Sequence, residues 1–102
     1  MGLPYCTISS TALSEMLPLL ASTGAIVTLQ PRSDGESDSL IATYRCDRAS
    51  DAVVYVYVLK SGECSSCYTI VFDPHPSSPL NRSANVLLEE LMSAVHILEV
   101  TM

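Results

Sequence analysis

The stretch DAVVYVYVL at residues 51–59 decides the fold of this chain. It is a dense run of β-branched and aromatic residues, which favour strands over helices. We therefore favour a strand over these residues. A helix over the same residues stays open as the alternative, because Ser50 or Asp51 is a suitable N-cap and Gly62 lies just past the end.

Shorter apolar runs on both sides of this stretch predict further strands. They lie at residues 5–8 (YCTI), 25–29 (AIVTL), 40–44 (LIATY) and 68–72 (YTIVF). Turn-forming residues separate these runs, above all RSDGESDS at residues 32–39, which we interpret as a flexible acidic loop. The order of the runs predicts a sheet built largely from neighbouring antiparallel strands.

Residues 11–17 are ambiguous. Leu13, Met16 and Leu17 have helical spacing, and Ser10 is a candidate N-cap. Pro18 follows within the same apolar run, where a proline breaks a helix or confines a strand to a sheet edge. Residues 5–30 therefore form either a hairpin or a strand–helix–strand unit.

The C-terminal quarter predicts a long amphipathic helix. Residues 73–79 (DPHPSSP) hold three prolines and predict a stiff, extended connector, with Ser78 and Pro79 suited to the start of a helix. Over residues 81–98 one apolar stripe recurs at helical spacing: Ala84, Leu87, Leu88, Leu91, Val95 and Leu98. We therefore predict an α+β fold over the single domain 1–102. It consists of an antiparallel sheet of about four to six strands, packed by this helix and with room for one further helix.

Composition and charge narrow the partners. The chain has 102 residues, of which 48% are apolar and 16% charged, so it can build one hydrophobic core. Eleven acidic residues face five basic ones, for a net charge of −6. Such a chain lacks the clustered basic residues that nucleic acids and anionic membranes attract. Residues 1–5 also lack the basic start of a secretory signal, so we expect a cytoplasmic or nuclear protein with protein partners.

The motif Cys64-Ser65-Ser66-Cys67 is the one pattern with chemical potential. A redox CxxC normally opens a helix, whereas this one opens a predicted strand. A zinc site would need two more ligands, and the candidates Cys6, Cys46, His75 and His96 are scattered singly. We expect inert turn cysteines with free thiols, and a thiol or zinc protein using Cys64 and Cys67 stays as the alternative.

No catalytic motif accompanies these residues. The sequence lacks a GxSxG elbow, and its four glycines are too dispersed for a phosphate-binding loop. His75 is expected in the proline-rich connector and His96 beside the helix stripe, neither of them next to a nucleophile. The prediction is a non-enzymatic protein without a cofactor.

The apolar surplus points to binding. Mean hydropathy is +0.32, high for a domain that buries only about 60–65% of its surface. Either all apolar side chains fill the core, or some stay exposed and form a protein interface. Under the second reading we predict partner contacts by the following residues: Leu87, Leu91, Met92, Val95, Tyr55 and Tyr57.

Part of the N-terminal region resembles a known family. Cys6-Thr7, Ser10, Gly24 and the run AIVTLQP at residues 25–31 are similar to the opening Cys-Thr strand and the Gly-x-Leu-Val-Ser-Leu-Glu-Pro strand of the proteasome assembly chaperone 3 family. The resemblance implies a non-enzymatic chaperone that forms a heterodimer with a paralogous subunit. Together they would dock on proteasome α subunits while the 20S α-ring forms. The family has a helix where residues 51–59 lie, and the CSSC turn and the proline connector depart from its pattern.

A second resemblance concerns the last helix. Ser83, Asn85, Leu87-Leu88-Glu89 and Leu91, followed by Thr101-Met102, are similar to the end of the small dimerisation subunit of the KEOPS tRNA-modification complex. This resemblance implies a non-enzymatic scaffold subunit. Its pattern upstream of the helix, a strand, a helix and two strands, fits this chain less well.

Overall fold

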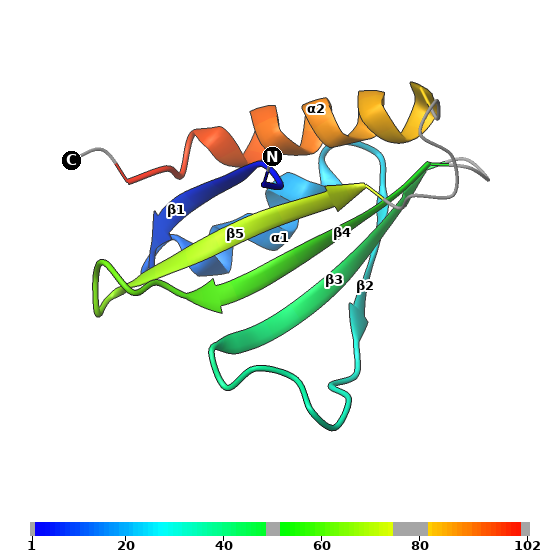
Figure 1. Ribbon diagram of the computed structural model, residues 1–102. Helices are drawn as coiled ribbons and strands as arrows, with labels where there is room; N and C mark the ends of the chain where they lie inside the picture. Colours follow the sequence, from blue (N-terminus) through cyan, green and yellow to red (C-terminus); the bar gives the residue numbers. More distant parts are fainter. Residues whose placement is uncertain (1, 49–51, 75–81, 101–102) are drawn as a thin grey trace.

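The computed structural model describes residues 2–48, 52–74 and 82–100 (Figure 1). Its elements follow in chain order: β1 (Tyr5–Ser9), α1 (Leu13–Ala21), β2 (Ile26–Gln30), β3 (Leu40–Arg48), β4 (Ala52–Lys60), β5 (Cys67–Pro74) and α2 (Arg82–His96). Within these residues the five strands form one sheet in the order β1-β5-β4-β3-β2, and every neighbouring pair is antiparallel. The predicted α+β class is confirmed.

The predicted strand is confirmed as β4, which is the central strand of the sheet, and the helical alternative for this stretch is wrong. Alternate side chains are buried along it, from Ala52 through Val54 and Val56 to Val58. Val56 lies opposite Tyr44 of β3 and Phe72 of β5. Because β-branched side chains pack well on a pleated surface with neighbours on both sides, tertiary packing and propensity agree here.

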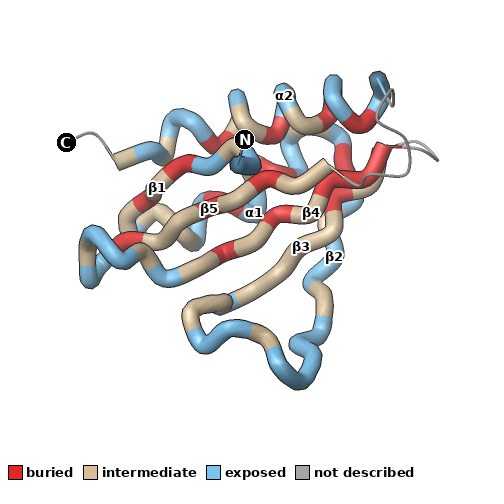
Figure 2. Tube along the Cα trace, in the orientation of Figure 1, coloured by how far each residue is buried: buried red, intermediate tan, exposed pale blue. Residues whose placement is uncertain are grey.

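Both helices lie on one face of the sheet (Figure 1). Helix α2 packs on β4 and β5, and α1 packs beside α2 and reaches β2. The core between the two layers contains the fully buried Phe72, Leu87 and Leu91, and α1 adds Met16 and Leu20. Figure 2 shows the buried segments on the central strands and on the inner sides of the helices, with exposed loops around them. None of the described helices is long and apolar enough to cross a membrane.

Residues 5–30 form the strand–helix–strand unit, not the hairpin. Pro18 lies inside α1, where it removes only the backbone bond to the carbonyl of the exposed Ser14, so water can take its place. Ser10 is not the N-cap, which is Ala12. Instead, the Ser10 N–H donates to the Ser66 carbonyl at 2.8 Å and links this unit to the β4–β5 turn.

The predicted connector begins later than expected. Asp73 and Pro74 belong to β5, where Pro74 is the last residue and so interrupts no following ladder bond. Residues 75–79, with His75 and Ser78, lie outside the described residues.

In the acidic loop 32–39, the Arg32 guanidinium donates to the carbonyls of Leu40 at 2.8 Å and Ser37 at 3.1 Å. Its flexibility stays a prediction.

Candidate protein-binding face

The face of the sheet opposite the helices is called the open face here. Antiparallel register aligns one row of side chains across all five strands on it: Tyr5, Val71, Tyr57, Thr43 and Gln30. Tyr55 and Leu59 point to the same face, because they alternate with the buried valines of β4. The apolar group Tyr5, Tyr55, Tyr57, Leu59 and Val71 is called the open-face patch below.

Hydrogen bonds orient the polar groups around the patch. The Tyr57 hydroxyl donates to Asp73 Oδ2 at 3.3 Å. Burial and the neighbouring Asp73 charge raise the pKa of Tyr57, so its hydroxyl stays a donor. Arg45 Nε donates to Asp47 Oδ2 at 2.9 Å, and this bond raises the pKa of Arg45. An aromatic centre bordered by paired charges is the usual composition of a protein interface.

The two edges of the sheet differ. Along β1, the Val100 N–H donates to the Thr7 carbonyl at 2.7 Å and Glu99 pairs with Ile8, so the segment after α2 covers part of that edge. In the described part of the chain, β2 pairs with β3 and with no other strand. Ile26 at this edge is 71% exposed. Tyr5, at the other end of the open face, is 67% exposed.

The predicted partner residues fall into two groups. Tyr55 and Tyr57 lie on the open face and are half-buried. Leu87, Leu91 and Val95 are fully buried, so the expectation that they remain exposed for a partner is wrong. The stripe they form is covered by the chain's own sheet, against which Met92 also packs in part.

Tyr5 was missed as a patch residue by sequence reasoning, although a signal was present. Cys6 and Ile8 are the apolar positions of β1 that face the helices, and strict alternation places Tyr5 on the opposite face.

The cysteines also fall into two pairs. A disulfide joins Cys64 and Cys67, whose Cα atoms are 5.2 Å apart, so the expectation of free thiols is wrong for this pair. Both sulfurs are used in that bond, and the described residues hold no group of three or more metal-binding side chains. Cys6 and Cys46 are free and buried. Burial raises their pKa values to about 11 and about 12, which makes both thiols poor nucleophiles.

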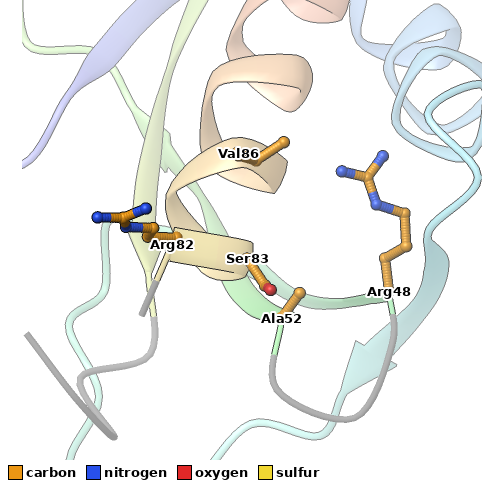
Figure 3. A pocket seen from close by; sticks show the side chains of 5 residues that line it. All are labelled: Arg48, Ala52, Arg82, Ser83 and Val86. Atoms are coloured by element: carbon orange, nitrogen blue, oxygen red, sulfur yellow. The ribbon is translucent and has the colours of Figure 1, made fainter. Parts of the chain in front are cut away.

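A shallow pocket of about 260 Å³ lies at the start of α2 (Figure 3) and is lined by Arg48, Ala52, Arg82, Ser83 and Val86. The two guanidinium groups lie on opposite sides of it (Figure 3). Arg48 is already engaged, because it pairs with Glu90 and donates to the Thr23 carbonyl at 2.9 Å. This pairing lowers the pKa of Glu90. Arg48 thus links α2 to the turn before β2.

His96 at the end of α2 is exposed, and its Nδ1 lies 3.0 Å from the Glu99 carboxylate. This contact links the last turn of α2 to the segment that follows it.

No model of a known protein family matches the sequence, and no curated protein matches it.

Proposed function

We propose that the protein is a non-enzymatic binding subunit that docks a partner protein on the open-face patch. The observation that carries the proposal is the apolar centre of a sheet face on which neither helix packs. Tyrosine brings a large contact area at a low cost in side-chain entropy, so it suits such a surface. The charged groups beside the patch are engaged, Arg45 with Asp47 and Asp73 with the Tyr57 hydroxyl, which favours a contact surface over a reaction site.

The family resemblance supplies the specific form of this proposal. The partner would be a paralogous chaperone subunit, and the pair would assist assembly of the 20S proteasome α-ring. The residues that carry the similarity lie on β1, in the turns on either side of α1 and on β2, and this shared order supports the proposal. Strand β4 departs from the family pattern, in which a helix occupies this place.

A second candidate role, also that of a non-enzymatic binding subunit, is the small dimerisation subunit of the KEOPS complex. Its resemblance lies on α2, where Ser83, Asn85, Glu89 and Glu90 are exposed. Its pattern has two strands between the helices, whereas the described chain has four. For this reason we propose the proteasome role first.

The test compares open-face and control variants in binding. Tyr5→Ser combined with Val71→Thr removes apolar contact from the patch at positions that are not part of the core. Ile97→Ser, at a position that is 73% exposed on the segment after α2, is the matched control. Affinity for the partner, recovered from native extract and identified by mass spectrometry, is measured for each.

We expect the double variant to weaken binding by at least about tenfold, as loss of an interface centre does, and the control to bind normally. Recovery of proteasome α subunits or of KEOPS subunits decides between the two forms. Loss of binding in Ile97→Ser with normal binding in the double variant would place the interface on the helical side and refute the proposal.

A further inference from the structure

The hairpin between β4 and β5 holds two cysteines of unequal exposure. Cys67 is the first residue of β5 and is only 8% exposed. Cys64 lies in the turn before it and is partly exposed. The 5.2 Å between their Cα atoms is within the range that a disulfide spans without backbone movement. The bond therefore has one side open to an attacking thiol and one side protected.

We propose that this hairpin is a thiol–disulfide exchange site that a small or protein dithiol reduces through Cys64. The inference is independent of the protein-binding function proposed above, because it concerns the hairpin turn and its chemistry alone. It departs from the expectation of inert turn cysteines and follows the alternative of a thiol protein that uses Cys64 and Cys67.

The reaction balances with a dithiol as the reductant. One thiolate of the dithiol attacks Cys64 Sγ, the bond between Cys64 and Cys67 breaks, and Cys67 leaves as a thiolate that takes a proton from water. The second thiol of the reductant then attacks the sulfur joined to Cys64, releasing Cys64 and forming the reductant's own disulfide. Two electrons pass from the dithiol to the protein. Ser66 Oγ lies 3.5 Å from Cys64 Sγ, where its hydroxyl can donate to the released thiolate.

The other two cysteines do not compete for this reaction. Cys6 and Cys46 are on the side of the sheet that faces the helices, and both belong to the buried core. An attacking thiol would have to open that core to reach them. Exchange is therefore confined to the hairpin while the protein stays folded.

The disulfide also closes the turn that contacts the segment before α1. It spans Ser66, whose carbonyl accepts the Ser10 N–H at 2.8 Å, and Cys67 lies opposite Ser9 in the β1–β5 register. The Cys67 N–H donates to the Cys64 carbonyl at 3.2 Å within the same turn. Opening the bond removes the covalent restraint on the turn that holds Ser10. We expect the Ser10 amide to exchange with solvent faster in the reduced protein.

The first experiment counts thiols. The folded protein is equilibrated with oxidised or reduced dithiothreitol, quenched with acid, unfolded and alkylated, and its mass is measured. We expect two alkylated cysteines after oxidation and four after reduction, from the two free and four total cysteines of the chain. Four alkylated cysteines under both conditions would overturn the proposal.

The second experiment compares how accessible the two sulfurs are to exchange with an external partner. With oxidised glutathione, Cys64 in the Cys67→Ser variant should form a mixed disulfide at least about tenfold faster than Cys67 in the Cys64→Ser variant, because only Cys64 is accessible. Equal rates in folded variants, judged by circular dichroism, would contradict this order of attack. Peptide mapping of the mixed disulfide that reduced glutathione forms with the disulfide-bonded wild-type protein gives the information on attack directly, and also if either variant fails to fold: glutathione on Cys64 supports the mechanism, and glutathione on Cys67 overturns it.

Discussion

Raising the pH from about 8 to about 10.5 is expected to destabilise the folded protein through its two buried thiols. Cys46 is fully buried and Cys6 is 8% exposed. Burial raises the pKa of Cys6 to about 11 and that of Cys46 to about 12, from an ordinary value of 9.0. The negative charges of Glu99 and Asp47 add to the shifts of Cys6 and Cys46 respectively.

The direction of this pH effect depends on whether the folded or the unfolded state keeps the thiol protons to a higher pH. Above pH 9.0 the unfolded chain loses the thiol protons while the folded chain keeps them, so the free energy of unfolding falls as pH rises. The loss continues until the pH passes the folded-state values of about 11 and about 12. At pH 10.5 each thiol lowers the free energy of unfolding by about 2 kcal/mol relative to pH 8, or about 4 kcal/mol together. Such a loss is a large part of the stability of a small domain.

Urea unfolding followed by circular dichroism at the two pH values measures this loss. A Cys64→Ser/Cys67→Ser background prevents the free thiols from attacking the hairpin disulfide at high pH. Adding Cys46→Ala should remove about half of the pH-dependent loss, and adding Cys6→Ala as well should remove most of it. Each variant is compared with itself at pH 8, so the cost of the cavity cancels. An undiminished loss without Cys6 and Cys46 would refute the reasoning and assign the effect to other groups.

Three further results are expected. Leu91→Ala, in the buried stripe of α2, should lower the free energy of unfolding by about 2–5 kcal/mol in urea titrations. Val86→Ala, on the exposed side of the same helix, should change it by less than about 1 kcal/mol. Equal effects would contradict the packing of α2. Arg48→Gln should lower Tm at neutral pH, because it removes the ion pair with Glu90. The difference in Tm from wild type should shrink below pH 4.5, the ordinary pKa of the Glu90 carboxyl. The ion pair stabilises the fold above this pH, and that stabilisation is lost as pH falls through the lowered folded-state pKa of Glu90. Reducing the hairpin disulfide, which closes a loop of only four residues, should cost at most about 2 kcal/mol in urea unfolding, and a much larger loss would mean that the bond holds more than the turn.

The central strands were predictable because local propensity and tertiary packing agree there. Residues 52–60 alternate between valines that face the helices and side chains that face away, and a strand is the conformation that separates these two sets. The end of β3 was not predicted. Arg45, Asp47 and Arg48 make residues 45–48 look like a loop, yet Cys46 between them is fully buried. The charged side chains are accommodated because Arg45 and Asp47 pair on the open face, which is a contact that sequence order does not reveal.

The candidate site was only half predictable for a related reason. An apolar stripe indicates that a surface will be covered, but the sequence does not say whether the chain itself or a partner covers it. Leu87 and Leu91 are covered by the chain's own sheet, while Tyr55 and Tyr57 are on the face that the helices leave open. The disulfide was missed because a CxxC spacing fits free thiols, a metal site and a bonded pair equally well.

The open face differs from an ordinary solvated sheet face in how its polarity is distributed. An antiparallel sheet covered on one side normally carries polar side chains on the other. Strands β2 and β3 mostly follow that rule, with Thr28, Gln30, Thr43, Arg45 and Asp47 at open-face positions and Ile26 at the sheet edge as an exception. The rule fails over the other half of the sheet, where the open-face patch spans β1, β5 and β4. Solubility alone would not favour such a division within a chain of net charge −6. A partner centred on the row from Tyr5 to Tyr57, with its rim over β3, accounts for both halves. A substitution at Ile26, on the far edge of the same face, should therefore weaken binding less than one at Tyr5, although both side chains are similarly exposed.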